Sequence, residues 1–212
     1  LLENFAASSI GLSTSDTPLF VQFFWEHLAL GDAWEFHQTA PDITGEFRGK
    51  TSVVLYENGR GKMRALAAAQ DRDRGRDRQG VNAWGKNGVA VGLMGDLTAS
   101  IYNGSKFDNN IGVLVPIEAA NLAALWCFCS AGNYAAEIRK IDKKLNVTNG
   151  TLTKVPFDLP YWKQIAAERY PNGLPDPYSD DPTQWIFHGH PQPATDPLLV
   201  AVARLVGYTW PA

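Results

Sequence analysis

The stretch from Asn109 to Asp158, NNIGVLVPIEAANLAALWCFCSAGNYAAEIRKIDKKLNVTNGTLTKVPFD, decides how the rest of the chain can be arranged. It predicts, in succession, a buried strand over 111–115, two helices and a strand that ends at Pro156. In the first helix, apolar side chains at positions i, i+3, i+4 and i+7 form one stripe, made by Leu122, Leu125, Trp126 and Cys129. That stripe needs a sheet or another helix to cover it.

The second helix repeats the apolar spacing at Tyr134, Ile138 and Ile141, and Asn133 stands where an N-cap is expected. Its last turns and the residues after them carry four cations, Arg139, Lys140, Lys143 and Lys144. Cations suit the negative end of a helix. They also leave a basic surface beside polar residues, which is a first indication of a surface that holds an anionic polymer.

Length and composition allow one large or two small domains with a substantial core, since 45% of the 212 residues are apolar and 11% are aromatic. The first residue is Leu1 and no basic-then-apolar leader follows, so we expect a piece of a longer protein. No apolar run approaches the roughly 18 residues of a membrane span, and we therefore expect a soluble protein. Cys127 and Cys129 point apart if they are helical, which argues against a disulfide between them and favours a cytoplasmic compartment.

The formal net charge of -3 hides an uneven distribution along the chain. Residues 1–44 carry six acids and no Lys or Arg (-6), residues 45–106 carry eleven basic and six acidic groups (+5), and residues 107–212 carry eight and ten (-2). The positive charge is concentrated in the middle third, as a local footprint for a polyanion requires. A chance fluctuation of a few charges is the alternative.

Several strands are predicted before residue 110. The aromatic run from Leu19 to Glu26 indicates a buried strand, and Trp34, Phe36 and Gln38 lie on one face of another. The β-branched segment that starts at Thr51 indicates a third strand, which ends at Asn58-Gly59. Three Asn-Gly pairs favour tight hairpin turns and hence an antiparallel sheet: Asn58-Gly59, Asn103-Gly104 and Asn149-Gly150.

Residues 71–80, DRDRGRDRQG, alternate in charge and contain no apolar residue, so we expect an exposed loop. Four arginines against three aspartates could meet phosphate there, although a solvated linker is the simpler explanation of the composition. Trp84, Lys86 and Asn87 follow at the entrance to a further strand, on a loop flanked by glycines.

The last third begins with a helix capped by Asp158 that stops before Pro171 and Gly173. A Pro-rich and Gly-rich segment leads from it to a final helix that Asp196 caps and Gly207 ends. We expect this final helix to pack back on the body of the protein or on a portion of the protein outside this sequence.

Known catalytic and metal motifs are largely missing. His188 and His190 with Cys127 and Cys129 invite a zinc site or a small zinc hydrolase, but the spacing is not that of a zinc finger. No G-x-S-x-G, P-loop or dinucleotide fingerprint occurs in the sequence. Seven tryptophans and three N-glycosylation patterns keep open a second class, a secreted carbohydrate-binding or glycosylated protein.

Three blocks of sequence together resemble the target-recognition region, that is the C-terminal specificity region, of adenine-specific DNA methyltransferases of type II restriction-modification and phage-defence systems. The likeness covers nearly the whole chain, and its most specific stretch runs from Tyr170 to the C-terminus. The segments that carry it are GLSTSD at 11–16, Phe20, FWE at 24–26, FDNN at 107–110, LWCFCS at 125–130, RKID at 139–142, KVPFD at 154–158, YPNGLP at 170–175, YSDDPTQWIFHGHP at 178–191, VAVARL at 200–205 and GYTWP at 207–211. The chain departs from the family at Ser15 and Leu19, which puts a phosphate contact at that loop in doubt.

The resemblance implies an α/β (α+β) fold with a curved, mostly antiparallel sheet with hairpins, packed by several helices, of the TaqI-like specificity-domain type. Residues 1–158 would form the DNA target-recognition domain and residues 159–212 a C-terminal helical arm packed on it. The partners implied are double-stranded DNA and a catalytic methyltransferase domain of the same polypeptide. That domain would use S-adenosylmethionine; no cofactor, metal or catalytic residue is expected in this chain, where the Asn-Pro-Pro-Tyr type motif is missing.

The role implied by the resemblance assigns DNA contacts to two kinds of side chain. Phosphate contacts are expected from basic residues of the middle third: Arg48, Lys50, Arg60, Lys62, Arg64, Lys86 and Lys106. Base edges are expected to be read by Asn87, Thr148, Asn149 and Lys154. For each of these residues, turn formation or simple solvation remains an alternative.

Overall fold

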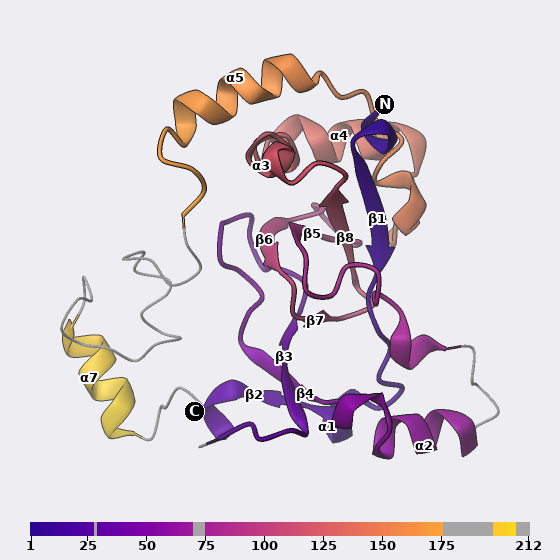
Figure 1. Ribbon diagram of the computed structural model, residues 1–212, viewed down its shortest axis with the longest axis vertical. Coiled ribbons are helices and arrows are strands. Elements are labelled where there is room, and N and C mark those ends of the chain that lie inside the picture. Colours follow the sequence, from indigo (N-terminus) through magenta and orange to yellow (C-terminus); the bar gives the residue numbers. More distant parts are fainter. Residues whose placement is uncertain (28, 70–74, 176–196, 207–212) are drawn as a thin grey trace.

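The computed structural model describes residues 1–27, 29–69, 75–175 and 197–206. Two four-stranded sheets organise this part of the chain (Figure 1). The first sheet is antiparallel throughout, in the order β1 (Ala6–Ile10), β8 (Ile111–Pro116), β5 (Asn87–Gly92), β6 (Ala99–Asn103). The second has the order β2 (Val21–Phe23), β4 (Ser52–Leu55), β3 (Trp34–Gln38), β7 (Lys106–Phe107).

The two sheets are joined where the chain leaves β6. Only Gly104 and Ser105 separate β6 in the first sheet from β7 in the second, and β7 pairs with β3 in parallel. In Figure 1, β7 accordingly lies between the two sheets. This joint brings residues of the middle third of the sequence, which carries the excess of positive charge, next to both sheets.

The helices fall into two groups at opposite ends of the molecule (Figure 1). One group covers the first sheet: α3 (Leu122–Cys129), α4 (Gly132–Ile141) and α5 (Leu159–Arg169). The other lies beside the second sheet: α1 (Thr17–Phe20) and α2 (Lys62–Ala69). A further helix is α7 (Pro197–Leu205), and the 3-10 turns are η1 (Leu2–Asn4), η2 (Phe24–Glu26), η3 (Glu57–Gly59), η4 (Arg76–Arg78), η5 (Ala119–Asn121) and η6 (Asn149–Thr151).

The largest core lies between the first sheet and α3. Val89 and Val91 of β5 face Leu125 and Trp126 of α3, and all four side chains are buried. α3 is buried on its other side as well, because Ala124 and Cys127 pack against Ala166 and its neighbours in α5. A helix covered on both sides has to be apolar all round, which explains why LAALWCFC contains no charged residue.

α5 is fixed at both ends by side-chain hydrogen bonds. The Asp158 carboxylate accepts a hydrogen bond from the Tyr161 backbone N–H at 3.2 Å and so caps the helix. Beyond the other end, the Tyr170 hydroxyl accepts from Trp126 Nε1 at 2.7 Å and donates to Glu46 Oε1 at 2.8 Å. The C-terminal end of α5 is thereby tied to α3 and to the segment before β4.

The mixed α/β class and the mostly antiparallel pairing are confirmed, with two sheets in place of one. The structure also confirms three predicted strands, at 111–115, around Phe36 and after Thr51. It confirms two predicted helices as well, at 122–129 and after Asp158. The final helix predicted from the sequence is present as α7. Its Leu198 and Leu205 side chains are exposed.

Four local predictions were wrong. Residues 146–158 form η6 and turns instead of a strand, and α4 begins after Ala131 rather than after Asn133. The run 19–26 is not one strand: Asp16 accepts from the Leu19 backbone N–H and Pro18 lies in the first turn, so α1 forms before β2. None of the three Asn-Gly pairs closes an antiparallel hairpin within the described residues.

The Asn-Gly pairs have other roles. Asn58 (φ 54°) and Gly59 (φ 70°) adopt the predicted positive φ angles, but the chain continues into α2. Gly104 carries the chain from the first sheet to the second, and Asn149 lies in η6. The true β5–β6 connection, residues 93–98, contains no such pair.

Candidate nucleic-acid interface

The clearest accumulation of cations lies where η3, α2 and η4 meet. After β4, positive φ angles at Glu57, Asn58 and Gly59 turn the chain sharply. The Glu57 carboxylate then accepts a hydrogen bond from the Lys62 backbone N–H at 2.6 Å, which fixes the start of α2. This turn leaves the Arg60 and Lys62 side chains exposed to solvent.

One buried carboxylate ties η4 to α2. Asp77 is 2% exposed, and its Oδ1 lies 3.4 Å from the Arg64 guanidinium. Because the side chain between them points inward, Arg76 and Arg78 on either side of Asp77 are exposed. We call these five cations the basic corner: Arg60, Lys62, Arg64, Arg76 and Arg78.

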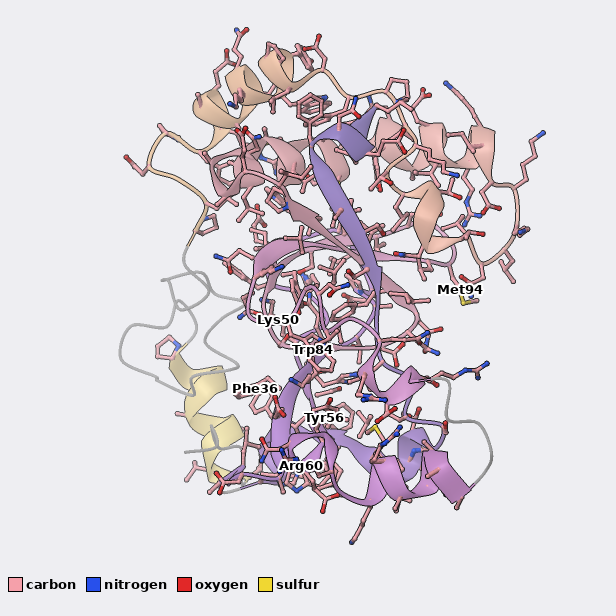
Figure 2. All side chains as sticks on the ribbon, turned by 45° about the vertical axis from the view of Figure 1, so that its right-hand side comes forward. Phe36, Lys50, Tyr56, Arg60, Trp84 and Met94 are labelled. Carbon is pink, nitrogen blue, oxygen red and sulfur yellow. The ribbon has the colours of Figure 1, made fainter. Side chains whose placement is uncertain are left out.

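Aromatic contacts connect the basic corner to the joint between the sheets. The Tyr56 and Trp84 rings meet edge to face with centroids 5.4 Å apart. The pKa of Tyr56 is raised by burial and then by Asp77 and Glu35, while Arg78 acts in the opposite direction. Arg78 therefore lies within electrostatic reach of the ring. In Figure 2, Arg60, Tyr56 and Trp84 follow one another from the bottom of the molecule towards its middle.

Lys106 makes three contacts within the protein at this joint. Its Nζ lies 3.8 Å from the Trp84 ring centroid, 4.7 Å from the Tyr56 centroid and 3.0 Å from Glu35 Oε2. The side chain is only 12% exposed. A cation placed on two aromatic faces and paired with a carboxylate holds β7, β3 and the Trp84 turn together. The phosphate contact predicted for Lys106 would have to compete with all three partners.

The two cations before β4 are also partly withdrawn from solvent. Lys50 Nζ is buried and has no hydrogen-bond partner among the described residues, and burial lowers the pKa of Lys50 from 10.5 to about 8. The Arg48 side chain is half-buried. Its backbone N–H donates to Ser100 Oγ at 2.9 Å, which attaches this segment to β6.

Lys86 and Asn87 lie on the surface at the start of β5 and are both exposed. They follow directly on Trp84 and Gly85, but the Asn87 side chain shares the face of β5 with Val89, whereas Trp84 packs against the cluster on the opposite face. The structure thus brings together Arg60, Lys62 and Arg64 in the basic corner and places Lys86 and Asn87 directly after Trp84 in the chain.

The remaining predicted base readers belong to a different part of the molecule. Asn149 holds η6 against β1, because its side-chain oxygen accepts from Ser8 Oγ at 2.5 Å. The Thr148 backbone N–H donates to Asp142 at 2.9 Å, and the Thr148 and Lys154 side chains are exposed. These three residues are not joined to the basic corner by any contact seen among the described residues.

Arg76 and Arg78 were not named among the predicted phosphate contacts, although the four arginines of the run 71–80 were considered for that role. The run 71–80 was expected to be an exposed loop because it alternates in charge, yet Asp77 within it is buried by its pairing with Arg64. In the sequence, the signal for the exposed Arg76 and Arg78 was the excess of arginine over aspartate in the run 71–80, which follows the segment that carries Arg64. Residues 70–74 of this run lie outside the described residues.

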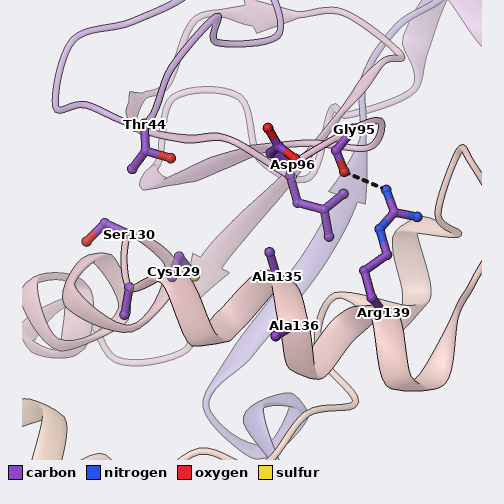
Figure 3. A pocket seen from close by; sticks show the side chains of 11 residues that line it. Thr44, Gly95, Asp96, Cys129, Ser130, Ala135, Ala136 and Arg139 are labelled. Atoms are coloured by element: carbon purple, nitrogen blue, oxygen red, sulfur yellow. Dashed lines mark hydrogen bonds between the residues drawn. The ribbon is translucent and has the colours of Figure 1, made fainter.

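A cavity of about 400 Å³ opens between the start of α4 and the β5–β6 connection (Figure 3). Arg139 lines it, but its guanidinium already donates to the backbone carbonyl of Gly95 at 2.7 Å and to those of Lys144 and Leu145. Asp96, Thr44 and Ser130 supply its other polar side chains. Because the Arg139 guanidinium donates to three backbone carbonyls near the end of α4, these hydrogen bonds compete with any ligand in the cavity.

No metal site is formed by the described residues. Cys127 and Cys129 are both reduced and buried, and they face different clusters, Cys127 towards α5 and Cys129 towards the first sheet. Burial raises the pKa of both thiols. His188 and His190 lie outside the described residues. Among the helices that the structure describes, none has the length and apolar character to cross a bilayer.

Comparisons with known proteins give little further information. No protein-family model matches the sequence, and no curated protein matches it significantly. Among solved structures, the chain is similar to the HsdS subunit from Thermoanaerobacter tengcongensis, with 12% sequence identity and a TM-score of 0.45. The similarity covers 79% of this chain and 34% of that one, so the chain spans about a third of the length of the HsdS subunit.

Proposed function

We propose that this chain is a module that recognises double-stranded DNA in a sequence-specific manner, as part of a restriction-modification or phage-defence system. The basic corner is the observation that carries the proposal. Five cations come from α2 and from two short elements that contact it, η3 and η4, in a chain whose net charge is -3. An acidic protein that concentrates its cations in this way presents a local footprint for a polyanion.

The geometry suits phosphate binding in particular. Arg60, Lys62, Arg76 and Arg78 are exposed, and the buried Asp77 pairs with Arg64. Duplex DNA presents one negative charge about every 1.7 Å along its axis, so several neighbouring cations can each meet a phosphate. Such contacts provide affinity and orient the protein, while base contacts elsewhere provide specificity.

The finer part of the proposal concerns the reaction that the module serves. We propose that it directs an adenine-N6 methyltransferase that uses S-adenosylmethionine and that belongs to the same polypeptide. The sequence blocks described above support this part of the proposal. In that arrangement this chain holds the duplex and reads base edges, and the catalytic domain takes the target adenine out of the base stack.

Binding measured against salt tests the DNA proposal. The variant R60A/K62A should bind a random duplex more weakly than the wild type at low salt. Its plot of log K against log[salt] should be shallower by about 1.8, since each phosphate contact contributes a slope of about 0.9. Both residues are exposed, so the fold should be unaffected.

The matched control is K143A/K163A, which removes the same charge from exposed positions after α4 and in α5. It should leave the slope unchanged. Equal effects of the two double variants would show that only net charge matters and would refute the basic corner as the footprint. A wild type whose affinity for duplex DNA does not change with salt would refute the function itself.

A further inference from the structure

Two asparagines face each other at the end of β5 and β6. Asn87 and Asn103 are directly opposed in the antiparallel register, so their side chains lie on the same face of the sheet. Opposed residues in such a pair have Cβ atoms about 4.5–5.5 Å apart. The next pair inward on that face, Val89 and Ile101, is buried, whereas both asparagines are exposed. The row of side chains thus changes from apolar to amide where it reaches solvent.

Backbone hydrogen bonds help to hold this end of β5 and β6 together. The Gly85 N–H donates to the Gly104 carbonyl at 2.8 Å, and the Lys86 N–H donates to the Ala83 carbonyl at 3.1 Å. Gly85 and Gly104 have φ angles of +72° and +93°, and a Cβ on Gly104 would lie 2.9 Å from Gly85 Cα. Glycine is therefore required at the contact.

Neither asparagine is needed for that turn. Within the part of the chain that the structure describes, neither carboxamide is seen to make a hydrogen bond, and neither residue adopts a positive φ angle. Turn formation, the usual reason for Asn before Gly, therefore does not account for Asn103. Each side chain keeps one acceptor and two donor hydrogens free for a partner.

Two free carboxamides side by side at the end of a sheet match one nucleic-acid feature. In the major groove of B-DNA, a carboxamide pairs in a bidentate manner with N6 and N7 of adenine. Lys86 is exposed next to Asn87 and can meet a phosphate beside the groove. Trp84, which lies just before β5 in the chain, contacts Tyr56.

We propose that Asn103, together with Asn87, reads adenine in the recognised sequence, an inference that rests on the proposed DNA-binding function. Asn87 was expected to read a base from its position in the sequence. Asn103 is assigned here because the strand register places it beside Asn87. Two amides on adjacent strands can address two neighbouring base pairs.

Selection of bound duplexes from a randomised pool tests the inference. The wild type should enrich a motif with adenine at one or two fixed positions. Asn103→Ala should lose the preference at one of these positions by about 5- to 150-fold, the range for one bidentate base contact. Asn103→Asp should replace adenine by cytosine there, since a carboxylate accepts a hydrogen bond from cytosine N4. Salt dependence of binding to a random duplex should stay that of the wild type.

Asn133→Ala, which removes another exposed carboxamide, is the matched control and should leave the motif intact. Thermal melting shows whether each variant is folded. If the wild type selects a motif and both Asn103→Ala and Asn87→Ala select the same one with equal strength, the inference is overturned while the DNA function stands. If the wild type does not bind duplex DNA at all, the proposed function and this inference fail together.

Discussion

Replacing Lys50 by Met should stabilise the protein, because the structure buries the ammonium group without a partner among the described residues. Burial lowers the pKa of Lys50 from 10.5 to about 8. A shift of one pKa unit corresponds to about 1.36 kcal/mol. The charged form therefore costs the folded state on the order of 3 kcal/mol at neutral pH. Methionine has a similar length and carries no charge.

The same pKa shift fixes how stability should change with pH. The unfolded chain keeps the Lys50 proton up to about pH 10.5, whereas the folded protein releases it near pH 8. Between these values the unfolded state binds more protons, so the free energy of unfolding rises with pH. Below pH 8 both states are protonated and the cost of the buried charge is present in full. Lys50→Met should remove this rise.

Urea unfolding followed by tryptophan fluorescence between pH 6.5 and 10 measures both effects. At pH 7, Lys50→Met should gain up to about 3 kcal/mol over the wild type, and the difference should shrink as the pH approaches 10. Lys143→Met, at an exposed position, is the control and should show neither effect. A Lys50→Met protein that is less stable than the wild type at pH 7 would refute the reasoning.

DNA binding gives an independent test of the same residue. If Lys50 Nζ stays inside the protein, Lys50→Met should keep the salt dependence of duplex binding. A slope that is smaller by about 0.9 would instead show that the ammonium group reaches a phosphate. The stability and binding measurements together therefore decide between the predicted phosphate contact and the buried position.

Two further predictions concern α5, and urea unfolding checks both. Tyr170→Phe should cost about 1–3 kcal/mol of unfolding free energy, because it leaves the buried Nε1 of Trp126 without its acceptor and removes the donor to Glu46; a loss no larger than that of Tyr161→Phe would contradict this role. Asp158→Ala should cost about 1 kcal/mol by removing the cap of α5, and Asp158→Asn should restore most of it, whereas equal losses in both variants would argue against the cap.

The pattern of apolar residues along the sequence predicted those helices and strands whose burial follows a regular period. The strand at 111–115 and the helix at 122–129 were predicted correctly because buried strands and apolar helices show in consecutive residues. The single apolar stripe assigned to that helix was too narrow, since Ala124 and Cys127 face α5. The sequence does not reveal a second covering element that arrives more than 30 residues later.

The turns were predicted less well because tertiary contacts override the preference of Asn-Gly for a hairpin. Asn58 and Gly59 do adopt positive φ angles, but the Glu57 carboxylate caps the next residues and makes them helical. Asn149 stays in η6 because Ser8, which lies 141 residues earlier, donates to it. Local sequence gives the conformation of a turn, and the partner that decides its direction lies elsewhere in the chain.

In the candidate site, too, local sequence predicted some features and long-range contacts decided the others. Charge counting located the cations in the middle third, and the structure gathers Arg60, Lys62 and Arg64 of that set. Charge counting could not show that Lys106 is held by Glu35 and Trp84. Lys106 meets Glu35 because β7 pairs with β3, and this pairing is a long-range contact. Nor could charge counting show that Asn103 stands opposite Asn87, which is a matter of strand register.

In the proposed function, the contacts at the joint between the sheets have a mechanical consequence. Phosphate contacts fix the position of a protein on the duplex, and base readers discriminate only if they are held in a constant position relative to those contacts. The basic corner reaches the end of β5 through Tyr56, Trp84 and Lys106, all of them packed or paired. A cation on two rings and a carboxylate cannot move without losing three interactions. In the proposed function, the inward position of Lys106 would serve specificity by fixing Trp84 and Tyr56, which lie between the basic corner and the end of β5.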